Sequence, residues 1–161
     1  YYLSHTLDSV LGARGVGLDI SVPAAKYLAK AHSRIGSIVA DVWQQLPIAT
    51  GGVHAITVVF APRNPAEFAR VLADDGQVIA LIADQGHLDE LREPLGILGV
   101  EPGKLDRLVE QAEGHLELAE DPKELVFPMR LDRESIAAQR TPMDPFSGQM
   151  REDMTTAPPS A

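Results

Sequence analysis

One segment limits the possible folds of this chain more than any other, because residues 53–61 (VHAITVVFA) form its strongest strand pattern. A nearly continuous apolar run of this length is typical of a strand buried on both faces. Shorter runs of the same kind predict further strands at 15–20, 36–40 and 77–83. Strands of this type usually pair in parallel beneath helices, so we expect an α/β architecture.

Helix-start signals alternate with these strands. Ser21 is a good N-cap residue, and a helix is expected from about residue 22 to 34. Asn64, Pro65 and Glu67 form an N-cap, first-turn and N3 set, which predicts a second helix after Asn64. Helices placed between most of the strands indicate a mostly parallel, doubly wound sheet.

The remaining elements rest on weaker patterns. Residues 1–140 are expected to form one domain, and the polar, proline-punctuated stretch 141–161 is expected to be a disordered tail. The other expected elements are a first helix with an apolar stripe of Leu3, Leu7, Val10 and Leu11, a turn at Asp74-Asp75-Gly76, helices at 87–95 and 104–112, and a strand at 124–131.

Composition narrows the class of protein. With 161 residues, 45% of them apolar, the chain is long enough for one domain with a core. The 14 Lys and Arg against 23 Asp and Glu give a net charge of −9, which argues against binding nucleic acid through the overall field. A local basic patch, or an RNA contact from another part of a larger protein, stays open. The absence of cysteine excludes disulfides, thiolate zinc sites and cysteine nucleophiles.

No segment of the sequence has the pattern of a membrane span or a signal peptide. The longest apolar runs, near 56–61 and 78–83, are far shorter than a bilayer requires. We therefore expect a cytoplasmic protein with no membrane partner.

Three features follow the expected strands at their carboxyl ends, where open parallel sheets bind ligands. Asp19 follows the first strand, where an acid can accept both hydroxyls of a ribose. Asp41 follows the second, where a carboxylate commonly faces an adenine amino group. Phe60-Ala61-Pro62 ends the third, where the reactive part of a cofactor would meet its substrate. Each acid alone is also explained as a helix-cap or loop residue, so nucleotide binding and a structural role both stay open.

Other site types have less support. Gly12, Gly15 and Gly17 have neither the spacing nor the context of a G-x-G-x-x-G phosphate loop, which would have to end ahead of Tyr1. The five histidines include no i, i+4 pair, so no metal site is expected. Trp43 is suited either to stack on a base or to cap the core, and its position alone favours the core.

A series of short matches, in order and at compatible spacing over roughly residues 1–138, carries a family resemblance. The matches are Tyr1-Tyr2, Gly17-Leu18-Asp19-Ile20-Ser21, Ala25-Lys26, Leu46-Pro47, Phe60-Ala61-Pro62, Glu67, Arg70-Val71-Leu72, Gly76, His87-Leu88, Glu90-Leu91 and Pro128-Met129-Arg130-Leu131. Together they resemble the S-adenosylmethionine-dependent methyltransferases that modify guanine N1 in large-subunit ribosomal RNA, a group that includes the tylosin-resistance type.

The resemblance implies a class I methyltransferase, a Rossmann-like fold, with S-adenosyl-L-methionine as cofactor and large-subunit ribosomal RNA as partner. No metal is expected in this chain, and no catalytic residue is named, because methyl transfer depends mostly on positioning. The target guanine would leave its stack to reach the pocket. The residues implied to bind cofactor are Tyr1, Tyr2, Asp19, Ile20, Asp41, Val42, Phe60 and Ala61, and the substrate candidates are Pro62, Arg63 and His87.

The departures from the family pattern predict an incomplete sheet. Family members carry an N-terminal cysteine-rich zinc module, a glycine loop with its preceding strand, and further strands at the end, none of which this sequence shows. In the family's sheet order the missing first strand lies between the strands that end at Asp19 and Phe60, so we expect a truncated relative with a central gap and unpaired backbone groups. Alternatives are a non-catalytic remnant or interaction domain, a small-molecule methyltransferase, and a nicotinamide-dependent oxidoreductase that shares only the acid at Asp19.

Overall fold

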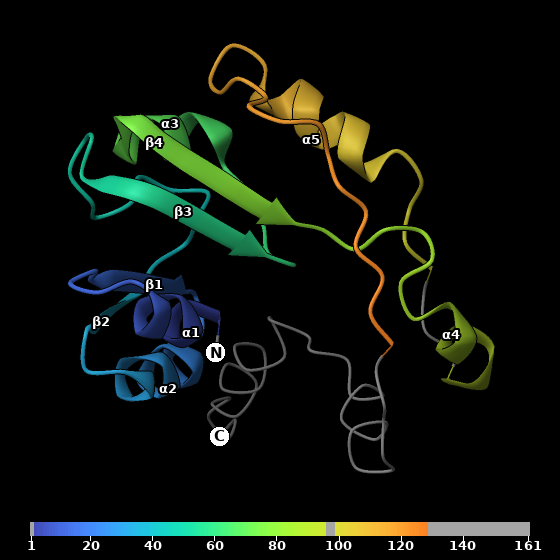
Figure 1. Ribbon diagram of the computed structural model, residues 1–161, viewed down its shortest axis with the longest axis horizontal. Coiled ribbons are helices and arrows are strands. Elements are labelled where there is room, and N and C mark those ends of the chain that lie inside the picture. Colours follow the sequence, from blue (N-terminus) through green and yellow to red (C-terminus); the bar gives the residue numbers. More distant parts are fainter. Residues whose placement is uncertain (1, 96–98, 129–161) are drawn as a thin grey trace, which may run out of the picture. The chain divides into compact units, whose positions relative to one another are not determined.

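The computed structural model describes residues 2–95 and 99–128 (Figure 1). The chain divides into two compact units, one of Tyr1–Asp89 with Gly99–Pro122 and one of Glu90–Leu98 with Lys123–Ala161. All of the strands that the structure describes belong to the first unit. No helix within the described ranges is long and apolar enough to cross a membrane.

The first pair of strands is formed by β1 (Gly15–Asp19) and β2 (Ile35–Val39). They pair in parallel, from Gly15 opposite Ile35 to Asp19 opposite Val39. The crossover helix α2 (Val22–Ala31) packs on both strands, and α1 (Tyr2–Ser9) contacts β1. Ser21 caps α2 as predicted, but the helix ends at Ala31, not Arg34, because the chain becomes extended at His32.

The second pair is formed by β3 (Val53–Val59) and β4 (Leu72–Leu81), which are joined by α3 (Pro65–Val71). They pair in parallel, and their arrows run the same way in Figure 1. Val53 lies opposite Leu72 but Ala55 lies opposite Gln77, so two steps along β3 match five along β4.

The predicted turn at 74–76 is therefore wrong as a separator of elements, because it lies inside β4 as an irregularity of the ladder. Gly76 fits there for a steric reason. A Cβ at this residue would lie 2.7 Å from Leu72 side-chain carbons.

The two pairs form separate sheets. In the described part of the chain, β1 pairs only with β2, and β3 only with β4. That a missing strand accounts for this interruption, as the family resemblance implies, stays a prediction. Alternating helices and strands with small parallel sheets confirm the α/β class.

Few apolar residues in the described part of the chain are fully buried. The prediction that residues 53–61 are buried on both faces is wrong, because only Val58 is buried in β3 while His54, Ala55 and Thr57 are exposed. A two-stranded sheet cannot cover both of its faces and both of its edges. The buried apolar residues described are Leu7, Ala25, Ile35, Leu46, Val58, Phe68 and Val71.

Beyond β4 the structure contains two described helices, α4 (Asp89–Leu95) and α5 (Lys104–Ala112). Both were predicted, α4 from two residues earlier. The predicted strand at 124–131 is wrong for its described part, because residues 124–128 are exposed and pair with no strand. Its remainder, and the predicted tail at 141–161, lie outside the described residues.

Candidate functional site

Asp19 is the last residue of β1, and one of its two carboxylate oxygens already accepts a hydrogen bond. Its Oδ1 accepts a hydrogen bond from the backbone N–H of Ser21 at 2.8 Å, and the Ser21 hydroxyl accepts one from Ala24 N–H at 3.4 Å. The local bond fixes the carboxylate at the start of α2. The other oxygen, Oδ2, has no hydrogen-bond partner among the described residues and is the atom that a ligand hydroxyl can reach.

Asp41 is held in the same way beyond β2. Its Oδ1 accepts from the backbone N–H of Trp43 at 3.0 Å. The N–H of Ala40 donates to the Asp19 carbonyl at 3.2 Å, so pairing continues up to the residue before Asp41. Because β1 and β2 are parallel, Asp19 and Asp41 follow the same edge of one sheet.

The loop that follows Asp41 is anchored to α3. Asn64 caps α3 by accepting from Glu67 N–H at 3.3 Å, and its side-chain amide donates to the Val42 carbonyl at 3.1 Å. Glu67 Oε1 accepts from Leu46 N–H at 2.6 Å. Leu46 is itself buried, so the loop is attached by both a polar and an apolar contact.

Arg70 completes this attachment. Its guanidinium donates to both carboxylate oxygens of Glu67, with Nε to Oε2 at 2.9 Å, and to the carbonyls of Leu46 at 3.1 Å and Ile48 at 3.0 Å. It also donates to the hydroxyl of Thr50 at 3.2 Å. The Arg70 hydrogen bonds, and then that of Leu46, lower the pKa of the Glu67 carboxyl, while Glu67 raises the pKa of Arg70. We call these two residues and their loop partners the α3 clamp.

The sequence analysis missed the α3 clamp. It gave Glu67 only the N3 position of a capping set, whereas the side chain turns to the loop at Leu46. The available signal was the i, i+3 spacing of Glu67 and Arg70, which places both on one helix face.

The carboxyl end of β3 has an unusual backbone. Phe60 N–H donates to the Leu81 carbonyl at 3.0 Å, which continues the ladder, but Phe60 itself has φ = 50°. A non-glycine residue in the left-handed region is uncommon and is often found at functional positions. The Phe60 ring is 54% exposed, and its centroid lies 5.4 Å from that of His87, with the rings tilted by 37°.

The residues after Phe60 are solvent-facing except for one. Ala61 and Pro62 are exposed, and Arg63 is half-buried. The Nε atom of Arg63 is buried without a hydrogen-bond partner among the described residues. An unsatisfied buried donor of this kind is costly.

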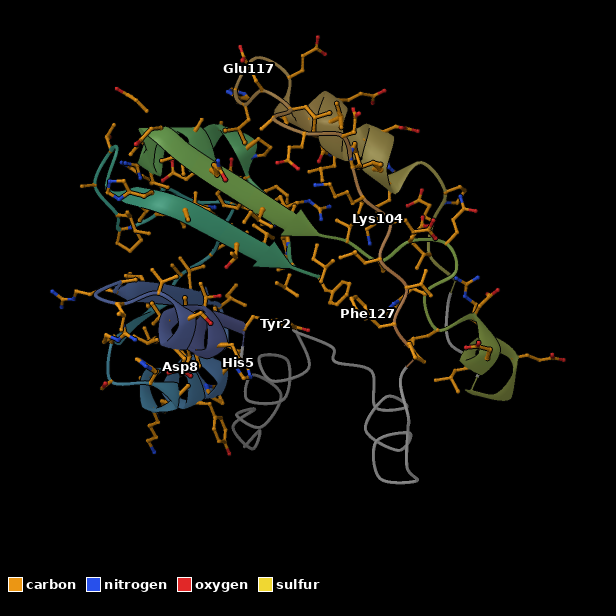
Figure 2. All side chains as sticks on the ribbon, in the orientation of Figure 1. Tyr2, His5, Asp8, Lys104, Glu117 and Phe127 are labelled. Carbon is orange, nitrogen blue, oxygen red and sulfur yellow. The ribbon has the colours of Figure 1, made fainter. Side chains whose placement is uncertain are left out.

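The structure thus groups the predicted residues at the ends of two strand pairs. Trp43 is 61% exposed, so the expectation that it caps the core is wrong. Tyr1 lies outside the described residues, and Tyr2 opens α1 with a half-exposed ring (Figure 2). Asp19, Ile20, Asp41 and Val42 follow β1 and β2, whereas Phe60, Ala61, Pro62, Arg63 and His87 follow β3 and β4.

Two cavities are found among the described residues, and none of the predicted site residues is among those that line them. One, of about 220 Å³, is lined by residues 82–85 and by the start of α5 near Lys104. The other, of about 300 Å³, lies beside Ser4, His5, Asp8 and Ala31, and Figure 2 shows His5 and Asp8 on α1. Within the described ranges no three His, Asp or Glu side chains gather as metal ligands.

Comparison with known proteins finds relatives over most of the chain. The 23S rRNA (guanine(748)-N(1))-methyltransferase of Streptomyces fradiae is 40% identical over 136 residues, which is 84% of this chain and 48% of that protein. A putative 23S rRNA (guanine-N(1)-)-methyltransferase of Micromonospora griseorubida is 42% identical over 118 residues, 73% of this chain and 40% of that protein. The chain is a homologue of these methyltransferases.

A third relative of this methyltransferase homologue is more distant. A putative 23S rRNA (guanine-N(1)-)-methyltransferase of Bacillus subtilis is 33% identical over 81 residues, half of the chain. The homologue spans about half the length, or less, of the curated relatives it matches. No family model and no solved structure matches it. The family resemblance drawn from the sequence is confirmed by these relatives.

Proposed function

We propose that this chain is the cofactor-binding part of a class I methyltransferase that transfers a methyl group from S-adenosyl-L-methionine to guanine N1 of 23S ribosomal RNA. The observation that carries the proposal is the pair Asp19 and Asp41 at the carboxyl edge of β1 and β2. Homology to methyltransferases of this specificity supports the reaction. A ribosomal substrate would place the protein in the cytoplasm.

The residues present fit the adenosine half of the cofactor. Asp19 Oδ2 is available to a ribose hydroxyl, while its Oδ1 is fixed by Ser21 N–H. Asp41 offers a second carboxylate to the adenine amino group, and the exposed indole of Trp43 offers a flat surface nearby in sequence. The α3 clamp holds the loop that carries these groups, so little ordering is needed when the nucleotide binds.

The second strand pair fits the transfer step. The bound cofactor supplies an electrophilic methyl carbon on sulfur, and the chain has to hold guanine N1 in line with it. Phe60 presents an exposed ring at the end of β3, beside Pro62, where a base can stack. Arg63, which follows Pro62 and is half-buried, carries a positive charge in the same segment, which suits an anionic group such as an RNA phosphate.

The charge of the chain limits what it does alone. A net charge of −9 does not attract phosphates, so RNA binding by these 161 residues is expected to be weak and to fall with salt. The proposal therefore assigns cofactor binding and methyl-transfer geometry to this chain, and not a strong grip on RNA.

Titration calorimetry with S-adenosylmethionine tests the proposal. The chain should bind it saturably, and Asp19→Asn should weaken binding about tenfold, because it removes the charge that strengthens the ribose hydrogen bond. Asp41→Asn should weaken it less, since one amino group is involved. Asp121→Asn, in an exposed segment, is the control and should change nothing. No binding, or tighter binding of NADH, would contradict the proposal.

A further inference from the structure

His87 and Phe60 are brought together by two neighbouring strands. Val59 lies opposite Leu81 in the parallel ladder, so the segments that follow β3 and β4 leave the sheet side by side. The ring centroids of Phe60 and His87 lie 5.4 Å apart, and both residues are exposed. The sequence separates them by more than twenty residues, so the contact is produced by the fold.

The backbone around both residues is constrained. Phe60 has φ = 50°, and Leu88, directly after His87, has φ = 55°. His87 N–H donates to the Asp84 carbonyl at 2.9 Å, and Asp89 N–H to the Gly86 carbonyl at 3.3 Å. Left-handed non-glycine residues are energetically unfavourable, so two of them beside one ring contact mark a position whose backbone conformation is held against strain.

The imidazole nitrogens of His87 are available. No described residue makes a hydrogen bond to them, and the ring lies against that of Phe60 at a tilt of 37°. Histidine is the side chain most often used to accept a proton near neutral pH. His87 is therefore an imidazole without a described hydrogen-bond partner, placed beside the exposed ring of Phe60.

We propose that His87 is a catalytic residue, the acceptor of the proton that guanine N1 loses during methylation. This inference rests on the proposed function. N1 forms a bond to the methyl carbon as the carbon–sulfur bond breaks, and that electron pair stays on sulfur, giving S-adenosylhomocysteine. The electrons of the N1–H bond remain on the base, and the proton moves to an imidazole nitrogen, from which water later removes it.

Single-turnover methylation of a guanine-containing 23S RNA hairpin tests this role. His87→Phe keeps a ring against Phe60 but has no acceptor, so the rate of transfer should fall by about 10² or more while S-adenosylmethionine affinity and RNA KM stay within twofold. In His87→Ala, added imidazole should restore part of the rate. His115→Phe is the matched control, because His115 is exposed and makes no described ring contact.

The outcomes separate this inference from the proposed function. Full activity in His87→Phe, or a His87→Ala defect confined to RNA KM and not rescued by imidazole, would show that His87 only stacks and would overturn the inference alone. If the unchanged chain binds S-adenosylmethionine but transfers no methyl group, both the transfer step and the role of His87 are overturned. If it does not bind S-adenosylmethionine, the proposed function itself fails.

Discussion

The two strand pairs of this molecule have the same topology, two parallel strands joined by one helix, but they differ in the regularity of their pairing. The β1–β2 pair has strands of five residues each in unbroken register. The β3–β4 pair has strands of seven and ten residues with an irregular ladder, and its β3 ends in a left-handed phenylalanine. Both pairs are parallel and both are connected by one helix. The regular pair carries the two acids, and the irregular pair carries the ring contact, which is consistent with nucleotide binding on one and bond making on the other.

The two regions also differ in the side-chain hydrogen bonds that hold their loops and helix ends in place. Beside β1, Arg34 donates to the carbonyls of Leu7, Val10 and Ala13, and so satisfies groups at and beyond the end of α1. Beside β3, the Glu67–Arg70 pair of the α3 clamp holds a loop between elements. The Arg34 hydrogen bonds cap the carbonyls at one helix end, so their effect is local. The α3 clamp connects the loop after Asp41 to the helix after Phe60, so it is the one that relates the proposed cofactor residues to the second strand pair.

The largest expected effect tests whether the two pairs are separate stability units. Phe68 is 5% exposed on α3, and Phe68→Ala should cost about 3–5 kcal/mol of the free energy of unfolding. Amide hydrogen exchange should accelerate in β3 and β4 while β1 and β2 stay protected. Ile35→Ala, at 8% exposure in β2, is the reciprocal experiment. In this variant exchange should accelerate in β1 and β2 while β3 and β4 stay protected. Equal acceleration in both pairs by either substitution would show a single cooperative unit.

A smaller loss of stability is expected when Arg34, which donates to the carbonyls at and beyond the end of α1, is replaced. Arg34→Ala removes three hydrogen bonds to carbonyls and should cost about 1–3 kcal/mol, with faster exchange confined to α1 and its junction with β1. Urea denaturation and exchange together measure both parts. Arg14→Ala removes an exposed arginine of the same region and should leave the unfolding midpoint unchanged. A matching loss in Arg14→Ala would mean that charge, not carbonyl capping, is the cause.

The smallest effect is a pH response of the α3 clamp. The pKa of Glu67 is lowered in the folded protein, so its contribution is complete above the ordinary glutamate pKa of 4.5 and is lost as pH falls through the lower folded value. Trp43, the one tryptophan of the chain, lies in the clamped loop and should show an acid transition in its fluorescence.

Two matched variants test whether Glu67 is the group that causes this acid transition. Glu67→Gln should remove the acid transition of Trp43. Glu101, whose pKa Arg107 lowers in a more exposed pair, has no described bond to the loop, so Glu101→Gln should preserve the transition. A transition that survives Glu67→Gln would assign the response to another group.

Local sequence signals predicted most elements but not how they assemble. The N-caps Ser21 and Asn64 located two helices because a cap depends on neighbouring residues. The strand expected at 124–131 failed in its described part because a strand also needs a partner, which no local pattern supplies. The burial expected for β3 failed for the same reason.

The candidate site likewise contains residues that a local rule could place and contacts that depend on how the elements assemble. Asp19, Asp41 and Phe60 could be placed from the rule that ligands bind at the carboxyl ends of parallel strands. The contact between Phe60 and His87 depends on the pairing of β3 with β4, and the bond from Glu67 to Leu46 depends on how a loop returns to a helix. Neither relation has a signature at one position of the sequence.

The most direct test of the central claim follows backbone amides during titration with a nucleoside. In ¹⁵N-labelled protein, the amides of Ser21 and Trp43 donate to the two carboxylates, so they report on ligands that reach Asp19 and Asp41. We predict that S-adenosylmethionine shifts both resonances saturably, and that adenosine alone reproduces the shifts while leaving the His87 amide unchanged. Shifts confined to β3 and β4, or to the cavity near Lys104, would contradict adenosine binding at the edge of β1 and β2.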